Sequence, residues 1–157
     1  MNQRTWPAII GLAATLVAGC AAPAQPTTPT TSARAAVLAM TVYRSPDCSC
    51  CHLWSEIARD AGWTVSTVDK LDMAAFKADA GVPDAAASCH TAMIDGYFVE
   101  GHVPMAAIER LLAERPAIDG IALPGMPAGS PGMSGQLAGP LDVLAVTDGE
   151  LTLFGSY

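Results

Sequence analysis

The sequence predicts an α/β domain whose strands and helices follow the order β-α-β-α-β-β-α. Three observations support this order. Apolar segments rich in Val and Thr alternate with segments whose apolar residues recur at helical spacing. An Asp-Gly pair between two apolar runs is typical of a tight β-hairpin. A Gly/Pro-rich stretch near the C-terminus excludes regular structure there and marks an addition to the basic fold.

The first half of the domain is predicted to form two strand–helix pairs. Residues 36–44 form an apolar run that stops at a Ser-Pro pair, as a buried strand would. In residues 50–61 the apolar side chains recur at helical spacing, and a glycine follows. Residues 63–69 alternate and are rich in Val and Thr, which favours a second strand, and residues 71–81 predict a short helix.

The second half is predicted to form a hairpin, a helix and an extension. The Asp-Gly pair at 95–96 separates the two strands of the hairpin. A proline then precedes the helix expected over residues 105–115. Residues 124–140 form the Gly/Pro loop, and a terminal hairpin turns at a second Asp-Gly pair, 148–149. The part of the chain from about residue 37 to residue 157 is long enough for one hydrophobic core and too short for two stable domains.

The N-terminal segment is predicted to be an export signal. Arg4 precedes an apolar run that is too short to span a bilayer and has the length of a signal-peptide core. The run ends in Leu-Val-Ala-Gly-Cys, which resembles a bacterial lipobox, so we expect removal of residues 1–19 and lipidation of Cys20. An ordinary signal peptide is the alternative. Residues 20–37 then form a disordered Pro/Thr-rich linker before the domain at 38–157.

The charge and the signal together restrict the partners. The chain has 15 acidic and 8 basic residues and a formal net charge of −7, which argues against nucleic acid as a partner. The lipid would hold the protein to a membrane on its periplasmic side. The cysteine of the lipobox is followed by alanine and not by an acidic retention residue, which favours the outer membrane.

Three cysteines and a histidine occupy residues 48–52. Cys48 and Cys51 lie three apart at the predicted start of a helix, where their sulfurs face the same way and free amide groups favour thiolates. Metal binding and disulfide exchange both need thiolates, and a structural disulfide is the alternative in an exported protein. Cys50 complicates a simple pair, because four cysteines in the domain allow three full pairings. His52 is a ligand or a solvent-facing residue.

The hairpin register predicts a second group. Counting outward from the two-residue turn places Cys89 opposite His102, with Cβ atoms about 5 Å apart, close enough to share an ion. His90 pairs with Gly101 and points to the other face if the strand is regular that far. The alternative is a buried cysteine and a surface histidine. A soft-metal site has a use for Cys and His here, whereas a generic thiol oxidoreductase does not.

The tripeptide Pro-Gly-Met occurs twice in the Gly/Pro loop and ends at Met126 and at Met133. A thioether is a soft ligand that binds without deprotonation, so methionine suits Cu(I) in an exported protein. The alternative is that both side chains cover apolar surface.

The predicted element order resembles a thioredoxin-like fold, with the Cys-x-x-Cys pair at its usual place. The stretches SPDCSCC, SCHTAMIDGYFVEGHVP and LPGMPAGSPGM closely resemble a bacterial family, once catalogued as a domain of unknown function, that includes the CopG copper-resistance proteins of the periplasm. The resemblance covers about residues 39–157. In that family the motif cysteines and histidines gather copper, in at least one member as a multinuclear cluster, and a role in copper redox conversion has been proposed. The matching positions here are Cys48, Cys51, Cys89, His90 and His102, with Met126 and Met133 in the Pro-Gly-Met motif.

The sequence thus predicts a periplasmic copper-binding lipoprotein that serves copper resistance, with copper ions and other periplasmic copper-handling proteins as partners. Two other functions stay open. In a thiol–disulfide oxidoreductase, Cys48 would attack and Cys51 would resolve. A zinc site also fits these residue types.

Overall fold

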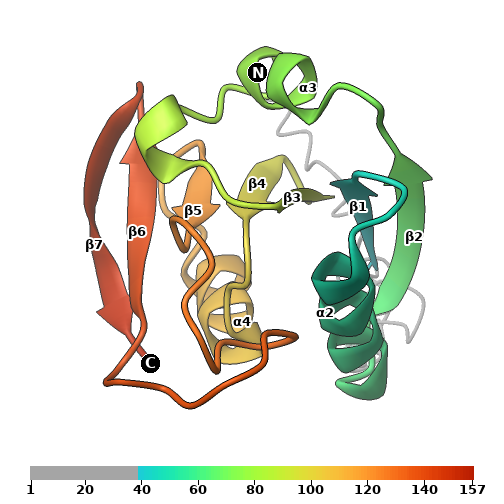
Figure 1. Cartoon of the computed structure of the whole chain (residues 1–157). Helices are drawn as coiled ribbons and strands as arrows, with labels where there is room; N and C mark the ends of the chain where they lie inside the picture. Colours follow the sequence, from blue (N-terminus) through green and yellow to red (C-terminus); the bar gives the residue numbers. More distant parts are fainter. Residues whose placement is uncertain (1–38) are drawn as a thin grey trace, which may run out of the picture.

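A mixed seven-stranded sheet forms the centre of residues 39–157, the part of the chain that the computed structural model describes (Figure 1). Its strand order is β2-β1-β3-β4-β5-β6-β7. The strands are β1 (Ala39–Arg44), β2 (Thr64–Asp69), β3 (His90–Ile94), β4 (Tyr97–Glu100), β5 (Gly120–Ala122), β6 (Asp142–Thr147) and β7 (Glu150–Ser156). The helices are α2 (Ser49–Asp60), α3 (Met73–Asp79) and α4 (Met105–Glu114), with a 3-10 turn, η1 (Asp84–Ala86).

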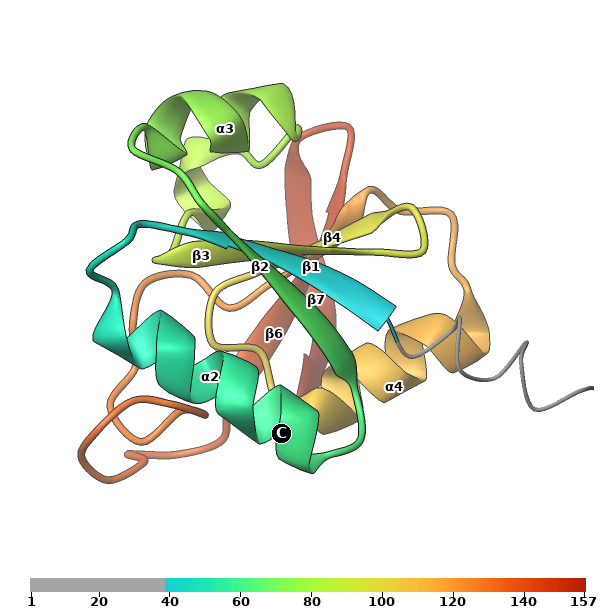
Figure 2. The same cartoon turned by 90° about the vertical axis from the view of Figure 1, so that its right-hand side faces the viewer.

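The helices cover both faces of the sheet. Figure 2 shows α2 and α4 on one face and α3 on the other. None of the helices in residues 39–157 is long and apolar enough to cross a membrane. The predicted signal segment (1–19), the lipidated Cys20 and the linker (20–37) lie outside the described residues.

The predicted order of the first seven elements is present, and the two hairpins turn where the sequence places them. Strands β3 and β4 pair from Ile94 and Tyr97 outward, and β6 and β7 pair from Thr147 and Glu150. In both turns the aspartate and the glycine have positive φ, as a two-residue turn between twisted strands requires. Strand β5 was not predicted, because three residues carry no periodic pattern.

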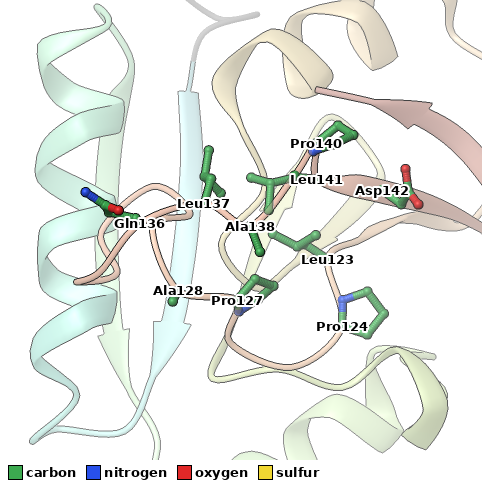
Figure 3. Close-up of a pocket in the computed structure, with 11 residues that line it drawn as sticks. Leu123, Pro124, Pro127, Ala128, Gln136, Leu137, Ala138, Pro140, Leu141 and Asp142 are labelled. Carbon is green, nitrogen blue, oxygen red and sulfur yellow. The ribbon is translucent and has the colours of Figure 1, made fainter.

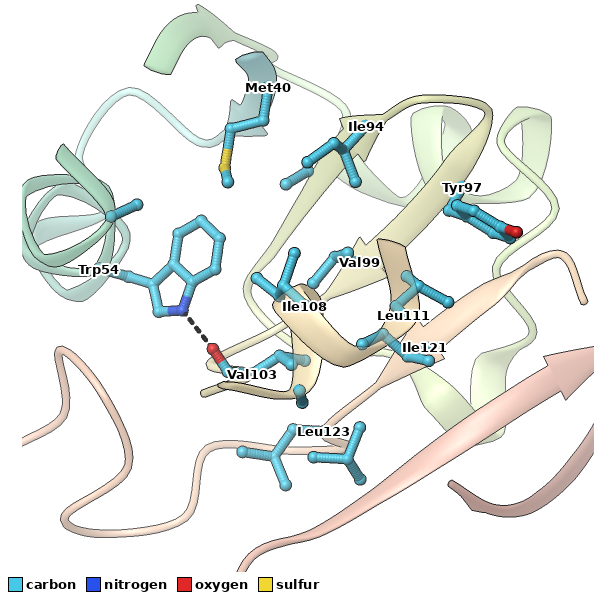
Figure 4. Packing of buried hydrophobic residues seen from close by; sticks show 14 of the residues in the cluster. Met40, Trp54, Ile94, Tyr97, Val99, Val103, Ile108, Leu111, Ile121 and Leu123 are labelled. Atoms are coloured by element: carbon cyan, nitrogen blue, oxygen red, sulfur yellow. Dashed lines mark hydrogen bonds between the residues drawn. The ribbon is translucent and has the colours of Figure 1, made fainter. Parts of the chain in front are cut away.

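The larger core lies between the sheet and helices α2 and α4 (Figure 4). Trp54 of α2 is fully buried in it, and its indole N–H donates to the backbone carbonyl of Val103 over 3.0 Å. Val103 belongs to the connection between β4 and α4. This bond therefore ties the cysteine-bearing helix to the segment that carries His102 and satisfies two buried polar groups at once.

A smaller apolar cluster lies on the sheet face that α3 covers. It contains Val82, Ala86, Phe98, Ala122 and Val146. The polar side chains of Lys77, Thr91 and Glu100 are also buried on this side of the strands.

Candidate metal centre

The cysteine-rich stretch lies at the start of α2, as predicted. Cys48 is the residue that precedes the helix and has extended backbone angles, and Cys51 is fully buried in the first turn. The two form a disulfide, with their Cα atoms 5.3 Å apart. The helix start thus brings both sulfurs together. Their assignment as metal ligands stays a prediction that applies to the reduced form, because a metal binds the thiolate.

Cys50 and Cys89 are the free cysteines of the described residues, and their sulfurs lie 3.8 Å apart. The Cys50 sulfur is also 3.6 Å from that of Cys48. The four sulfurs of Cys48, Cys50, Cys51 and Cys89 all lie within 4.8 Å of one another. Cys50 therefore lies between the sulfurs of Cys48 and Cys89. The sequence alone did not predict this position.

The expected contact between Cys89 and His102 is present. Cys89 Sγ lies 2.8 Å from His102 Nε2, and both residues lie just beyond the paired part of the β3–β4 hairpin. His102 is completely buried and so is not a surface residue. The hairpin register, together with the segment that precedes β3 and the one that follows β4, brings thiol and imidazole together.

His90 does not point away from this group, contrary to the expectation from a regular strand. Its Nδ1 lies 3.4 Å from Cys89 Sγ, and its ring centroid is 5.0 Å from that of His102. The alternation fails because β4 ends at Glu100 and Gly101 has φ +78°, which turns His102 toward the face of His90. A Cβ at Gly101 would lie 2.5 Å from the Cβ of Ser88, so this tight crossing needs glycine.

The Gly/Pro loop orients His102. His102 Nδ1 lies 2.7 Å from the backbone carbonyl oxygen of Pro131. A carbonyl only accepts, so Nδ1 carries the hydrogen and Nε2 presents its lone pair to Cys89 Sγ. A ligating histidine is commonly fixed in this way by a partner on its other nitrogen. No sequence pattern could predict this role of Pro131, because every residue has a backbone carbonyl.

The same loop packs against the start of α2. A Cβ at Gly132 would lie 2.8 Å from the Trp54 amide nitrogen and 2.9 Å from the Cys50 carbonyl oxygen, and its φ is +82°. The second Pro-Gly-Met motif therefore uses its glycine for close approach. Met133 follows it and is partly buried, whereas Met126 of the first motif is 57% exposed. The proposed thioether role of both stays a prediction.

The histidine of the stretch, His52, lies apart. Its side chain is exposed on α2, with Nε2 3.9 Å from the carboxylate of Glu56 one turn later. The His and Cys side chains that gather among the described residues form two groups, and His52 belongs to neither.

Burial sets the protonation of the group. Burial is the main cause of a rise in the pKa of Cys89 from 9.0 to about 12, and the neighbouring Cys50 contributes to the same rise. Burial also lowers the pKa of His90, with His102 and Lys77 acting in the same direction. It lowers the pKa of His102, opposed by the bond to Pro131. At neutral pH both imidazoles are neutral and can bind a metal, and metal binding at Cys89 would release a proton.

The residues present fit a soft metal. His90 Nε2 is buried and has no hydrogen-bond partner among residues 39–157, which is rare for a buried polar atom. The three side chains of Cys89, His90 and His102 offer ligand atoms within 4.8 Å of one another and share Cys89 with the four-sulfur group. Thiolate and imidazole ligands together suit copper and zinc.

An apolar cavity of about 430 Å³ is lined by residues from both ends of the Gly/Pro loop and by their neighbours (Figure 3). Leu123, Pro127, Leu137 and Leu141 are among the residues that line it, and none of its lining residues is a cysteine, histidine or methionine. It is therefore separate from the candidate ligands.

The fold and the site together define a mixed α/β protein with a Cys/His centre suited to soft metals. Residues 86–133 match the family described as "Protein of unknown function, DUF411". Two solved structures, both titled copper resistance protein copG, are each 43% identical to this chain and cover 76% of it. The chain covers 98% of the one called Form 2, with a TM-score of 0.71, and 97% of the one called Form 1, with a TM-score of 0.70.

The chain belongs to the CopG-type copper-resistance family. No curated protein matches its sequence.

Proposed function

We propose that this protein binds copper at the Cys/His centre and serves copper resistance on the periplasmic side of a membrane, to which a lipid on Cys20 anchors it. The observation that carries the proposal is the convergence of three chain segments. Thiols from the start of α2, and a thiol and two imidazoles from the ends of the β3–β4 hairpin, lie in two groups that share Cys89. The names of the two related structures, copper resistance protein copG, support the copper-resistance part of the proposal.

The scaffold we propose is thioredoxin-like. Strands β2-β1-β3-β4 are adjacent in that order, β1 and β2 are parallel, and β3 is antiparallel to both neighbours. The Cys-x-x-Cys pair stands at the start of the helix that follows β1. Strands β5, β6 and β7 extend this core.

The donor set favours Cu(I), because thiolates are soft ligands, and the two imidazoles would let the centre also hold Cu(II). Because Cys89 belongs to both groups, its thiolate is placed to bridge two ions. A cluster of more than one copper ion and a change of copper oxidation state are therefore part of the proposal. Other periplasmic copper-handling proteins are the partners that would deliver or accept the metal.

Titration of the reduced protein with Cu(I), in competition with a chelator of known affinity, tests the proposal. We expect at least one tightly bound Cu(I) per chain, and weaker binding in a Cys48→Ser, Cys51→Ser variant and in Cys89→Ser. Wild-type binding no stronger than that of these variants would exclude the centre as a copper site. Competition with zinc during the same titration separates a copper site from a structural zinc site.

A second function is favoured by the sulfur geometry. The Cys48–Cys51 disulfide has a free thiol, that of Cys50, 3.6 Å from Cys48, an arrangement suited to thiol–disulfide exchange. An oxidoreductase of this kind would reduce a disulfide substrate, or oxidise a dithiol substrate with its own Cys48–Cys51 disulfide as the electron acceptor, without metal. This activity would persist in His102→Ala. Metal-free protein that shows no such turnover excludes it.

A further inference from the structure

A buried ion pair contacts the metal-centre segment from the opposite face of the sheet. Lys77 of α3 pairs with Glu100 at the end of β4, and the side chain of Glu100 is completely buried. Lys77 Nζ also donates to Thr91 Oγ1 over 3.1 Å, and Thr91 Oγ1 donates to Glu100 Oε2 over 2.6 Å. Each polar group in this set therefore has a partner.

Glu100 makes one further bond, and that bond leads to the centre. The backbone N–H of Ser88 donates to Glu100 Oε1 over 2.6 Å. Ser88 directly precedes Cys89, and Glu100 stands two residues before His102. One carboxylate thus joins the segment that enters β3 to the segment that leaves β4, and these two segments carry the thiol and the imidazole that meet at 2.8 Å.

The pair is hard to explain as a stabilising device alone. Taking two charges out of water is costly, and apolar residues of similar volume commonly stabilise a fold as well or better. A fully satisfied buried network does, however, hold backbone segments in one arrangement. No backbone bond between the two hairpin segments reaches Ser88, because the outermost one runs from the Gly101 N–H to the His90 carbonyl oxygen, over 2.8 Å.

We propose that Glu100 is a positioning residue of the metal centre, with Lys77 as its counter-ion: the carboxylate holds Ser88 so that Cys89 meets His90 and His102. This inference rests on the proposed function, since it assigns the pair a part in copper binding. It extends the centre from the cysteine-bearing face to α3 on the opposite face.

Two variants without buried charge give the sharpest test. In Lys77→Met, Glu100→Gln, the amide oxygen can accept from Ser88 N–H and the amide nitrogen can donate to Thr91. In Lys77→Met, Glu100→Leu, neither bond can form. We expect the Gln variant to keep Cu(I) affinity within about threefold of wild type and the Leu variant to lose about tenfold or more, as for other supports of metal ligands. Equal affinity in the two variants overturns the assignment.

A third variant guards against failure of the Leu variant to fold. Glu100→Asp keeps the charge opposite Lys77 but is one methylene shorter, which draws the carboxylate away from Ser88. We expect it to bind Cu(I) about tenfold more weakly than wild type, and wild-type affinity in this variant overturns the proposal. Val146→Ala, a buried apolar change on the same sheet face, is the control for loss of stability alone and should leave copper affinity unchanged.

A copper-free measurement separates this proposal from the proposed function. Alkylation of Cys89 by iodoacetamide, followed at that residue by peptide mass spectrometry, reports how the thiol is held. We expect alkylation to be about tenfold faster in the Leu variant than in the Gln variant, at a temperature where both are folded. If wild type binds no copper, the proposed function fails, and the alkylation rates still decide the role of Glu100: equal rates exclude it.

Discussion

At the scale of single residues, the centre depends on which nitrogen of His102 faces the sulfur. Pro131 accepts from Nδ1, so Nε2 is free to bind. His52 offers a matched comparison, because it is an imidazole of the same chain that lies exposed on α2. The two residues have the same side chain, but His102 is buried at the centre and His52 is exposed away from it.

We predict that His102→Ala weakens Cu(I) binding at least about tenfold, equivalent to ~1.4 kcal/mol, whereas His52→Ala leaves it unchanged. The reason is that Nε2 of His102 lies 2.8 Å from Cys89 Sγ, whereas His52 belongs to neither group of candidate ligands. Competition with a Cu(I) chelator, with circular dichroism to verify folding, measures both. Similar losses in the two variants would contradict the assigned centre.

Trp54 gives a prediction on stability. Its indole N–H donates to the Val103 carbonyl in the core, and its ring lies 4.6 Å from that of His90. In Trp54→Phe the carbonyl loses its donor, and we expect the free energy of unfolding to fall by ~1–3 kcal/mol. Urea unfolding followed by circular dichroism measures this, and an unchanged midpoint would show that the bond contributes nothing.

Sequence reasoning reached some residues of the centre and missed others for identifiable reasons. The pairing of Cys89 with His102 was predictable because a two-residue turn fixes hairpin register. The direction of His90 was not, because it depends on the positive φ of Gly101, where the strand ends. The bond from His102 to Pro131 joins residues 29 apart through an aperiodic loop, and no local pattern encodes such a contact.

At the scale of elements, the strands and helices with clear periodicity were predictable. The complete order of the seven strands in the sheet was not. Apolar spacing places α2 and α4, and the Asp-Gly pairs place both hairpins. The insertion of β5 between β4 and β6 depends on three buried residues that form no pattern by themselves. The Gly/Pro loop between β5 and β6 was recognised as irregular, but its path toward α2 (Figure 1) follows from contacts that only the folded chain displays.

The two Pro-Gly-Met motifs of this loop make a controlled comparison. Gly125 and Gly132 both have positive φ, yet a Cβ at Gly125 would meet no atom within 4 Å, whereas one at Gly132 would meet the backbone of α2. We predict that Gly125→Ala costs ~1–2 kcal/mol of unfolding free energy from backbone strain. Gly132→Ala should cost a further ~1–3 kcal/mol from overpacking.

Copper affinity should also separate these two glycines. Displacement of the loop at Gly132 moves the Pro131 carbonyl from His102, so we expect about tenfold weaker Cu(I) binding in Gly132→Ala and none of this loss in Gly125→Ala. Urea unfolding and chelator competition on both variants provide the measurements. Equal behaviour would mean that the loop does not support the centre.

At the scale of the whole molecule, the disulfide and the proposed copper site use the same sulfurs. In the oxidised form Cys48 and Cys51 are bonded to each other, and the free thiols of the described domain are those of Cys50 and Cys89. Reduction adds two thiols to a group already within 4.8 Å. The redox state of one pair should therefore decide how much copper the entire domain binds and how far copper stabilises it.

We predict that Cu(I) at about 100 times its dissociation constant stabilises the reduced protein by ~2.7 kcal/mol, because a ligand that binds only the folded state shifts unfolding by mass action. The oxidised protein should gain less at the same copper concentration, since it lacks two of the thiolates. Thermal unfolding at fixed protein concentration, with and without Cu(I), measures both gains. The Cys48→Ser, Cys51→Ser variant should show the smaller gain whether or not reductant is present, and an equal gain in reduced and oxidised wild type would show that the helix-start thiolates do not hold the metal.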